Sequence, residues 1–594
     1  MPYKAPVPDI IFALNHIAGF SRLVEAGMFG DLDMATVEAI LEEAGRFATE
    51  ELAPINRNGD TNPARLAGKD VVTPPGWTEA YAKFVEGGWA ALPCPAEFGG
   101  QHLPAAIAMA VNEMWSGANM AFALCPLLSQ AGTEALDRYG SAALKAQYLP
   151  KLTSGEWTGS MQLTEPQAGS DLRFLKTRAM PTGDGSYRIT GTKIFITYGE
   201  HPMTANIVHL VLARLPDAPP GTKGISMFVV PKFLVNDDGS LGARNDVFCS
   251  KLEHKLGIHG SPTCVMNFGD EGGAAGWLIG EPHRGLHYMF TMMNRARLGV
   301  GVQSVGIAEA ACQQALGYAL DRRQGSVTGT PETEMAPIIG HPDVRRMLLS
   351  MKAKVAAARA LCLTNAVAID LAERGRDEAT RARAEADAAL LTPLSKSFGS
   401  DIATEVASEG IQVHGGMGFI EETGAAQHYR DARITAIYEG TNGIQCIDLV
   451  GRKLPMNGGD TVRAFLEGLK ETIGQVKASN EPTLGATAEC LGEGLAHLAE
   501  TSQWLGRKLM EDPKAALSGA TSYGRMFSLV AGGTLLARGA LSAIREGSGE
   551  ANEGQILLAR HFAEMQVPAT AGLRPIIYRS HDTVLSKAAG AVLG

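Results

Sequence analysis

One carboxylate in this sequence has the surroundings of a general base. Glu439 lies in the segment from Ile437 to Asn442, which reads Ile-Tyr-Glu-Gly-Thr-Asn, between a bulky aromatic residue and a glycine. The charges of the stretch from Arg430 to Arg433 come several residues earlier, so Glu439 has a largely uncharged neighbourhood. A carboxylate of this kind is either a capped loop residue or a base whose pKa is raised by burial. For a Glu-Gly pair taken alone, the loop residue is the better interpretation.

A second set of residues could hold a phosphate or a planar ring. The segment from Leu163 to Asp171 reads Leu-Thr-Glu-Pro-Gln-Ala-Gly-Ser-Asp. Its Thr164 and Ser170 hydroxyls, and the bare backbone at Gly169, can donate hydrogen bonds to a phosphate or to a flavin carbonyl. Taken alone, the same segment is better explained as a surface turn rich in small polar residues.

A predicted strand adds an aromatic ring to these hydroxyls. Phe195 and Thr197 flank Ile196 in the run from Lys193 to Thr197, and alternation along a strand places both on one face. An aromatic side chain beside a hydroxyl suits an isoalloxazine ring. The alternative for Phe195 is packing in the core.

Composition and charge exclude several classes of function. The chain has 594 residues, a net charge of −10 and no long basic run, so a nucleic-acid-binding face is excluded. Eight scattered cysteines without a Cys-x-x-Cys pair fit neither a disulfide framework nor a zinc knuckle, and no His-Glu-x-x-His motif indicates a metal. The N-terminus lacks the layout of a secretion signal, and no uninterrupted apolar run approaches the ~18 residues of a membrane span. We therefore expect a cytoplasmic protein with no metal and no membrane span.

Two further patterns are better explained by structure than by ligand binding. Gly299, Gly301 and Gly306 loosely match a dinucleotide fingerprint, but they lie in a helical pattern, so close helix packing is favoured. The run from Asn236 to Ser240 has calcium-type oxygens but lacks the later bidentate glutamate, so it is interpreted as a turn.

The elements that must position these residues change character twice along the chain. Residues 9 to about 158 are mostly helical, with Asp33 capping one helix, another over roughly 104–118 and a further one after Ser129. From about 160 to 290 come short β-rich runs without helical patterns between them, which favours an antiparallel sheet or small barrel. The predicted strands are Tyr187–Thr190, Lys193–Thr197, Asn206–Leu212, Gly224–Val230 and Thr263–Phe268.

From about residue 286 the pattern is helical again. Leu286 to Arg323 forms one long pattern, Asp343 is expected to cap a helix through Leu371, and 383–411 forms another helix. Four long antiparallel helices between 286 and 450 would form a bundle. After a boundary at 453–460, a helical region of about 130 residues follows. The predicted organisation is α+β with four parts: a helical domain (1–158), a β domain (159–285), a four-helix bundle (286–453) and an additional helical domain (454–594).

Taken together, the motifs resemble the acyl-CoA dehydrogenase family from about residue 35 to 453. Each motif is a weak signal by itself, but six in the family's order and spacing are a strong one. The matching segments are 95–100, 163–171, 193–197, 255–263, 411–419 and 437–441.

The resemblance implies an FAD enzyme and a role for each matching residue. Thr164 would bond the edge of the flavin and Thr197 would lie near its N5, while a neighbouring subunit would hold the rest of FAD. The residues implied to contact FAD are Met161, Leu163, Thr164, Gly169, Ser170, Phe195, Ile196, Thr197, Arg322, Gln324, Gln412, Gly415, Gly416 and Thr441. Those implied to contact the acyl-CoA are Ser170, Asn294, Arg297, Tyr438 and Gly440. From the residues alone, Arg322 could equally be a helix-end cation and Gly415-Gly416 a helix terminus.

The resemblance also gives Glu439 a function. It would remove the α-proton of an acyl-CoA thioester while the β-hydrogen leaves as hydride to the flavin, which yields a trans-2-enoyl-CoA. Electrons would then pass to an electron-transfer flavoprotein. The chain departs from the family pattern at Gln162, Phe174, Gly325 and Gly443, none of which carries the chemistry.

The chain's opening and its extra C-terminal helices narrow the resemblance. They are similar to bacterial 3-methylmercaptopropionyl-CoA dehydrogenases, which act in dimethylsulfoniopropionate breakdown. The alternatives are a medium- or long-chain fatty acyl-CoA dehydrogenase of β-oxidation, an acyl-CoA oxidase, and a non-catalytic scaffold. A homodimer is favoured over a tetramer, because the extra domain could occupy the surface that pairs dimers in shorter relatives.

Overall fold

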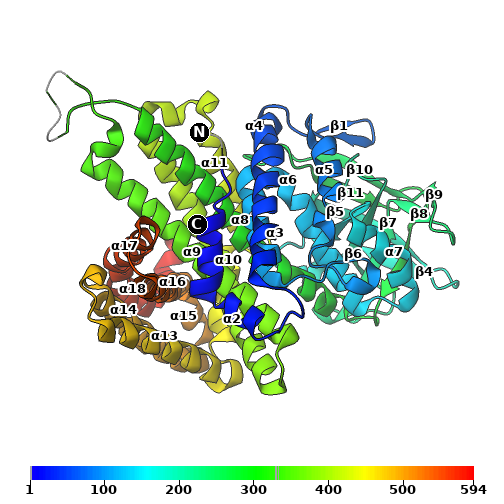
Figure 1. The fold of residues 1–594 in the computed structure, drawn as a ribbon. Helices are drawn as coiled ribbons and strands as arrows, with labels where there is room; N and C mark the ends of the chain where they lie inside the picture. The colour runs from blue at the N-terminus through cyan, green and yellow to red at the C-terminus, as the bar shows by residue number, and fades with distance from the viewer. Residues whose placement is uncertain (1–2, 328–330, 332–333) are drawn as a thin grey trace. The chain divides into compact units, whose positions relative to one another are not determined.

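The protein divides into two compact units, which are described separately. The computed structural model describes residues 3–327, 331 and 334–594 (Figure 1). One unit comprises Arg46–Pro104 and Ala118–Ala296, and the other comprises Met1–Gly45, Ala105–Gly117 and Arg297–Gly594. The former contains the sheet and is called the β unit, and the latter is called the helical unit.

Helices and a barrel-like sheet make up the β unit. Its sheet has the strand path β10-β11-β5-β12-β7-β6-β3, and β4 pairs with both β5 and β6. Because β5, β12, β7, β6 and β4 each pair with the next and β4 returns to β5, these five strands close into a small barrel. The small barrel predicted from sequence is thus present. The strands are β3 (Trp157–Gln162), β4 (Arg178–Pro181), β5 (Tyr187–Thr197), β6 (Asn206–Arg214), β7 (Ile225–Pro231), β10 (Val247–Leu252), β11 (Thr263–Phe268) and β12 (Ala274–Ile279).

Two pairings depart from the expected antiparallel pattern, both with β6. Strand β4 runs parallel to it at Arg178 and Arg214. Strand β3 runs parallel to β6, with Trp157 opposite Asn206 and Gln162 opposite Val211. All six residues of β3 are buried, which is typical of a parallel strand covered on both faces. The strand that leads into the Thr164 loop is therefore held inside the unit.

The remaining elements of the β unit are short. Strands β1 (Arg65–Ala67) and β2 (Asp70–Val72) form one hairpin, and β8 (Phe233–Val235) pairs with β9 (Leu241–Arg244). Between β8 and β9, Ser240 N donates to Asp238 Oδ1 at 2.9 Å, so the predicted turn is confirmed. The other elements are the helical segments η2 (Ala48–Leu52), α4 (Ala53–Thr61), α5 (Trp77–Glu86), η3 (Trp89–Ala91), η4 (Ala96–Phe98), α7 (Ala142–Ser154), η5 (Leu172–Phe174) and η6 (Thr222–Gly224).

The helices predicted at 104–118 and after Ser129 are two parts of one element. Helix α6 (Ala105–Tyr139) contains a break at Asn119, whose φ of −159° and ψ of 88° are not helical. The Asn119 side chain accepts from Phe122 N at 3.1 Å and so caps the part that follows. The second part therefore begins ten residues earlier than predicted, because the break depends on this asparagine rather than on a proline or glycine.

Three long helices form the centre of the helical unit. They are α8 (Gly285–Asp321), of which the part from Arg297 belongs here, α9 (Pro342–Arg374) and α10 (Glu378–His414). Instead of a fourth long helix, the chain has α11 (Ala425–Ala432) and α12 (Asn442–Asp448), and the Glu439 segment lies between them. The short segments η7 (Ile338–Gly340), η8 (Gly415–Phe419), η9 (Glu421–Thr423), η10 (Arg433–Ala436) and η11 (Leu449–Lys453) join or extend these helices.

Helix starts were predicted correctly in one case and wrongly in another. Asp33 caps α3 (Met34–Phe47), since Thr36 N donates to its Oδ1 at 2.7 Å. Asp343 does not cap α9. Pro342 occupies the first turn and His341 precedes it as the cap, while Asp343 accepts from Arg346 at 2.8 Å within the helix.

Small residues let α8 approach its neighbours closely, as predicted. A Cβ on Gly301 would lie 2.7 Å from Ser395 O, and one on Gly306 would lie 2.4 Å from Glu113 O. Because backbone atoms occupy this space, Gly301 and Gly306 of the fingerprint-like pattern serve helix packing.

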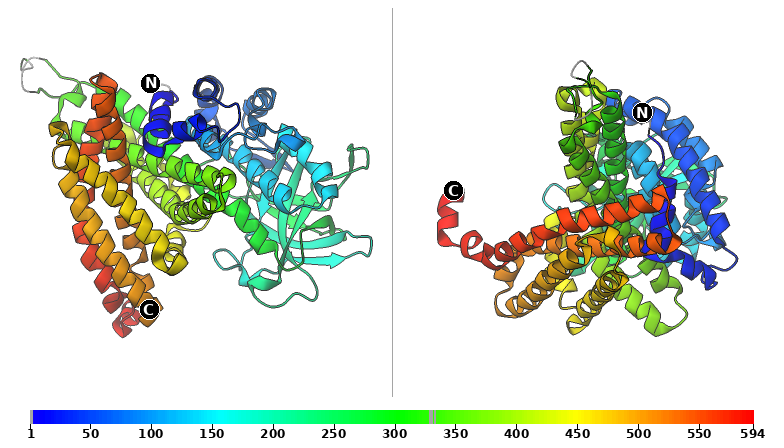
Figure 2. Two further views of the ribbon diagram at one scale, coloured as in Figure 1. Left: turned by 60° about the horizontal axis from the view of Figure 1, so that its bottom comes forward. Right: turned by 60° about the vertical axis from the view of Figure 1, so that its left-hand side comes forward.

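The C-terminal helices pack against α9, α10 and the N-terminal segment, and Figures 1 and 2 show them grouped side by side. The central one, α16 (Ala520–Glu546), is mostly buried. Its Arg525 pairs with Glu405 of α10 at 2.9 Å, and Arg538 donates to Ile17 O at 3.2 Å. The others are η12 (Met456–Gly459), α13 (Asp460–Ser479), η13 (Pro482–Leu484), α14 (Thr487–Glu511), α15 (Pro513–Ser518), α17 (Glu550–Met565), η14 (Val567–Ala569), α18 (Thr570–Val584) and α19 (Lys587–Leu593). The N-terminal segment comprises α1 (Val7–Phe12), the π-helix η1 (Ala13–Ala18) and α2 (Phe20–Glu25).

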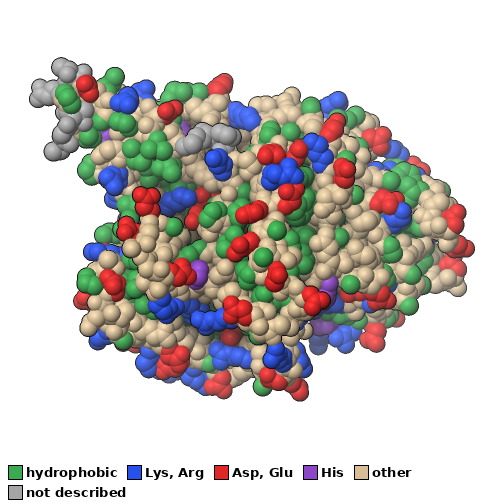
Figure 3. All heavy atoms as spheres, viewed as in Figure 1, with side chains coloured by type: hydrophobic (Ala, Val, Ile, Leu, Met, Phe, Trp, Pro, Cys, Tyr) green, Lys and Arg blue, Asp and Glu red, His purple; other side chains and the backbone are tan. Residues whose placement is uncertain are grey.

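Among the residues that the structure describes, two helices are long and apolar enough to cross a membrane by length and composition, but most of each is buried. Over its most apolar 18 residues, α9 has a mean hydropathy of 1.5 and is 72% buried. The corresponding stretch of α16 has a mean hydropathy of 1.4 and is 83% buried. Core helices pass the same test, so this finding does not establish a span. Figure 3 shows basic and acidic side chains interspersed over the face in view.

Candidate functional site

Glu439 lies in a strained turn of the helical unit, between η10 and α12. Its φ is +55° and that of Gly440 is +83°, so two successive residues adopt the left-handed conformation. Such a conformation is costly for a glutamate and persists only where the surroundings enforce it. This strain at a carboxylate marks the turn as a candidate functional site.

Hydrogen bonds to the backbone of the turn hold Glu439 in place. Gln445 Nε2 donates to Glu439 O at 3.1 Å, and Arg297 Nε of α8 donates to the same oxygen at 3.4 Å. Thr441 caps α12, because its Oγ1 accepts from Ile444 N at 3.3 Å. The Glu439 side chain therefore projects from a turn whose backbone is tied to both α8 and α12.

The electrostatic surroundings raise the pKa of Glu439. Desolvation by burial is the main cause, and the positive charges of Arg297 and Lys396 oppose it. A carboxyl whose pKa is raised is a stronger base when it is ionised than an ordinary surface glutamate. This agrees with the second interpretation of Glu439 made from the sequence.

The Tyr438 side chain links this turn to α8. Its hydroxyl donates to Gln303 Oε1 of α8 at 2.8 Å, and burial, together with the charges of Glu439 and Asp431, raises its pKa far above the range in which it would ionise. Tyr438 therefore remains a neutral hydrogen-bond donor beside the carboxylate.

In the β unit, a buried ion pair shapes the Thr164 loop. Glu165 Oε1 accepts from Lys193 Nζ of β5 at 2.8 Å, and from the Thr177 hydroxyl at 2.6 Å. Lys193 Nζ also donates to Leu163 O at 3.1 Å, and Ile194 N donates to Thr164 O at 2.9 Å. The loop is thus fastened on both sides of Thr164 to the strand that carries Phe195 and Thr197.

The pKa values of this pair show which effects prevail. Burial alone would raise the pKa of Glu165, but the charge of Lys193 and the hydrogen bonds outweigh it and lower the pKa to about 2. Burial lowers the pKa of Lys193 to about 8, against the opposing effect of the Glu165 charge. Both groups are charged at neutral pH.

Phe195 is displayed rather than packed in the core. It has a φ of +60°, and the pairing of β5 with β11 shifts register at this point. The Phe195 side chain is 61% exposed, while Ile196 is buried in the core and Thr197 is half-buried. Because the ring is exposed, the alternative of core packing is wrong for Phe195. The irregular strand turns the ring out to where a planar ligand could stack on it.

A third group of predicted residues gathers at the ends of α8 and α10. The rings of Tyr318 and His414 stack with centroids 4.5 Å apart, which brings the end of α8 beside that of α10. Gly415 has φ 59° and ψ −139°, a conformation that favours glycine, and a Cβ on Gly415 or Gly416 would meet nothing within 4 Å. Open space next to a glycine-dependent backbone is suited to a ligand.

The side chains of Arg322, Gln324 and Gln412 are exposed in the same region. Gln324 N donates to Ala336 O at 3.0 Å, which fixes the chain just after α8. The structure therefore brings the predicted residues of this region together in the helical unit.

The remaining predicted residues lie in different environments. Met161 is buried in the core of the β unit, and Leu163 packs against that core. Gly169, Ser170 and Asn294 are exposed, whereas Arg297 is buried. The roles inferred for these residues from the resemblance remain predictions.

The chain matches four sequence families that together cover most of its length. They are "Acyl-CoA dehydrogenase, N-terminal domain" at residues 35–156, the middle domain at 160–270, the C-terminal domain at 283–454 and "Acetyl-CoA dehydrogenase C-terminal like" at 460–587. The chain belongs to the acyl-CoA dehydrogenase family. It is an FAD-dependent enzyme of this family, as the resemblance of its motifs implied.

Relatives include proteins that match nearly the whole chain. A 3-methylmercaptopropionyl-CoA dehydrogenase of Ruegeria pomeroyi is 45% identical over 596 residues, which covers 99% of this chain and 100% of that protein. A butyryl-CoA dehydrogenase of Syntrophomonas wolfei is 37% identical and covers 80% of this chain and 79% of that protein. A solved Bacillus anthracis acyl-CoA dehydrogenase complexed with FAD shares the fold, with a TM-score of 0.74 at 22% identity, covering 92% of this chain and 88% of that one.

The residues of this acyl-CoA dehydrogenase fit FAD. Phe195 offers an exposed ring on a bulged strand beside the loop hydroxyls, which suits a flavin. Gly415 and Gly416 leave open backbone next to exposed polar side chains, which suits a phosphate or adenosine portion.

Sequence analysis missed several residues that support these sites. Lys193 and Glu165 lie in the matching segments but have no role predicted from sequence. Neither do Gln303, Lys396 and Gln445. One signal could have identified Lys396, which is a lone lysine within an otherwise uncharged run of α10, Leu390–Gly399.

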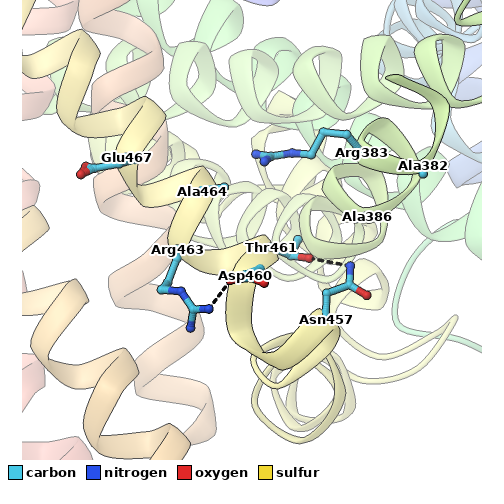
Figure 4. Close-up of a pocket in the computed structure, with 9 residues that line it drawn as sticks. All are labelled: Ala382, Arg383, Ala386, Asn457, Asp460, Thr461, Arg463, Ala464 and Glu467. Atoms are coloured by element: carbon cyan, nitrogen blue, oxygen red, sulfur yellow. Dashed lines mark hydrogen bonds and ion pairs between the residues drawn. The ribbon is translucent and has the colours of Figure 1, made fainter. Parts of the chain in front are cut away.

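A hollow elsewhere in the helical unit contains none of the predicted site residues. It has a volume of about 510 Å³ and lies between the start of α10 and that of α13 (Figure 4). Its charged side chains are engaged with neighbours, as Arg463 pairs with Asp460 and Arg383 with Asp387. The lining residues are Ala382, Arg383, Ala386, Asn457, Asp460, Thr461, Arg463, Ala464 and Glu467.

Proposed function

We propose that this enzyme oxidises 3-methylmercaptopropionyl-CoA to its trans-2-enoyl-CoA, with Glu439 as the base that removes the α-proton. The substrate is supported by the similarity over essentially the full length of both chains to the Ruegeria pomeroyi enzyme of that name. The proposed place of the reaction is dimethylsulfoniopropionate breakdown.

The strained, desolvated carboxylate of Glu439 is the observation that carries the assignment of the base. A thioester α-proton is weakly acidic, so its removal needs a carboxylate with a raised pKa and a fixed position. Glu439 has both, because burial raises its pKa and the bonds from Gln445 and Arg297 hold its backbone. When bound, FAD supplies a ring that accepts the β-hydrogen as hydride.

The proposed FAD-binding residues form two groups, one for each portion of the cofactor. The Thr164 loop and the strand Phe195–Thr197 would hold the flavin. The residues at the ends of α8 and α10 of a neighbouring subunit would hold the pyrophosphate and adenosine side. We propose that Arg297 and Tyr438 line the substrate's side of the base. Their contacts within the helical unit support this, because Arg297 bonds Glu439 O and Tyr438 adjoins the base.

The test is anaerobic reduction of the bound flavin by acyl-CoA. The purified wild-type enzyme should bleach fastest with 3-methylmercaptopropionyl-CoA in a panel that includes butyryl-CoA and long-chain acyl-CoAs. Replacing the base by Glu439→Gln should leave FAD bound and slow flavin reduction by about 10²–10⁴-fold or more. Rapid bleaching of this variant would rule out Glu439 as the base, and a preference for long chains would rule out the proposed substrate.

Butyryl-CoA is the second candidate substrate, because two butyryl-CoA dehydrogenases of Syntrophomonas wolfei are 37% and 36% identical to this chain. We also propose that electrons pass to an electron-transfer flavoprotein and that the enzyme is a cytoplasmic homodimer. Formation of hydrogen peroxide without an added acceptor would instead indicate an oxidase, and light scattering measures the oligomeric state.

A further inference from the structure

Lys396 of α10 is a lysine with a wholly buried side chain. Its exposed fraction is 0%, and the flanking Leu394, Ser395 and Phe398 are at most 1% exposed. An ammonium group in such surroundings loses its hydration, so it needs a hydrogen-bond partner and a compensating charge nearby. The role of Lys396 therefore depends on its hydrogen-bond partner and on the charges near its ammonium group.

A single asparagine links Lys396 to the turn that carries Glu439. Lys396 Nζ donates to Asn442 Oδ1 at 2.9 Å, and Ser400 Oγ donates to the same oxygen at 3.0 Å. On the other side, Asn442 Nδ2 donates to Asp401 Oδ1 at 2.7 Å. Asn442 is the first residue of α12 and comes three residues after Glu439, so α10 holds the turn through this side chain.

The titratable groups around Lys396 lie on the Glu439 turn and on three helices. Glu439 on the turn and Asp401 on α10 attract its ammonium, Arg297 on α8 repels it, and the Cys446 thiol on α12 also faces it. Burial is the largest influence and lowers the pKa of Lys396 to about 7. In the reverse direction, Arg297 and Lys396 are the two cations that lower the pKa of Glu439 against burial.

Arg297 and Lys396 differ in their hydrogen-bond partners. Arg297 donates to the backbone oxygen of Glu439, so its guanidinium is engaged in shaping the turn. Lys396 is bonded to Asn442 beyond the turn. Its positive charge lowers the pKa of the Glu439 carboxyl without a hydrogen bond to the Glu439 backbone.

We propose that Lys396 is a positioning residue for the base: its ammonium supplies the buried positive charge that favours the ionised form of Glu439, and its bond to Asn442 anchors the turn to α10. This inference rests on the assignment of Glu439 as the base under the proposed function.

The expected consequence is a change in the pH dependence of flavin reduction. Because the ammonium stabilises the Glu439 carboxylate, its removal raises the pKa of that carboxyl further. The acidic limb of the profile of reduction rate against pH should then move upward by about one pH unit. The difference from the wild-type enzyme should narrow above pH about 7, where Lys396 itself loses its proton.

The experiment measures anaerobic flavin reduction by a saturating acyl-CoA across pH, with the FAD-loaded full-length enzyme. Lys396→Met removes both the charge and the hydrogen bond, while Lys396→Gln removes the charge but keeps a group that can donate to Asn442. Lys396→Gln also keeps the test decisive if the methionine variant does not fold. Both variants should shift the acidic limb.

Lys352→Met is the matched control. Lys352 lies on α9 and is paired with Glu309 at 2.9 Å, so its loss removes a positive charge and a side-chain contact elsewhere in the helical unit. The control should leave the acidic limb where it is in the wild-type enzyme. An unmoved limb in Lys396→Gln, or an equal shift in the control, would overturn the proposal.

Glu439→Gln separates this proposal from the assignment on which it rests. If that variant fails to reduce its flavin and Lys396→Gln leaves the limb unmoved, only the role of Lys396 is wrong. If Glu439→Gln reduces its flavin at the wild-type rate, both the base and its positioning residue are wrong.

Discussion

Glu439, the proposed base, and the neighbouring Gly440 form a turn with a strained backbone. Both have positive φ values, but only glycine adopts that conformation without cost. The helices on either side supply the bonds that keep the glutamate strained, through Arg297 and Gln445. A base held in this way needs little reorganisation when the substrate arrives.

Gly440→Ala tests this arrangement at the scale of the residue. A Cβ at this position would lie 2.8 Å from Gln445 Nε2, so the Gln445 side chain must move and weaken its bond to Glu439 O. We expect a loss of about 1–2 kcal/mol in stability from the left-handed backbone, and slower flavin reduction in addition. Thermal unfolding and stopped-flow reduction measure the two effects.

Gly424→Ala is the matched control for this prediction. Gly424 has a φ of +80°, but a Cβ there would lie 3.6 Å from the nearest atom, Gln314 Nε2, which is an ordinary contact. This control should lose similar stability and reduce its flavin at the wild-type rate. Equal reduction rates for both variants would show that Gln445 does not matter to the base.

The Thr164 loop is held to strand β5 by the bond from Lys193 to Glu165. Lys193→Met would leave the buried Glu165 carboxylate without its cation, a change that typically costs about 3–5 kcal/mol. Lys151→Met breaks an exposed pair with Glu156 in the same unit and should cost at most about 1 kcal/mol. Thermal unfolding and FAD release should both separate the two variants. Similar melting temperatures would show that the buried pair is not what holds the loop.

The same pair predicts a dependence of stability on pH. The pKa of Glu165 is lowered in the folded protein to about 2, so its contribution to stability is present above the ordinary carboxyl pKa. It is lost as the pH falls through about 2.

Across the whole helical unit, α16 joins regions that are far apart in the sequence. A Cβ on Gly532 would lie 3.2 Å from Ala357 Cβ of α9, and one on Gly539 would lie 2.9 Å from Ile17 of the N-terminal segment. The C-terminal helices therefore cover apolar surface of α9 and η1 and are part of the core of this unit.

A chain that ends after Lys453 should consequently expose this apolar surface and lose most of its soluble yield. A chain that ends after Ser586 lacks only α19, which has no buried residues, and should be as soluble as the full-length protein. Soluble yield and light scattering compare the two truncated chains. A soluble, FAD-binding chain that ends at Lys453 would show that the C-terminal helices are dispensable for folding.

Sequence patterns predicted those elements whose signals are local. The cap at Asp33, the strand Thr263–Phe268 and the packing glycines of α8 follow from short-range rules about side chains and backbone, and the structure has them. The cap at Asp343 and the helix after Ser129 were placed wrongly, because neighbouring residues, Pro342 and Asn119, determined the helix ends instead.

The sequence by itself determined the family, the cofactor and the carboxylate that resembles a base, because motif order and spacing are properties of the chain alone. Only the tertiary structure showed the left-handed turn at Glu439 and the display of Phe195 on a bulge. It also revealed the lysines at 193 and 396, whose importance depends on burial and on partners from other elements. A charge becomes significant when folding removes its water and brings a distant residue next to it, and no local pattern records that event.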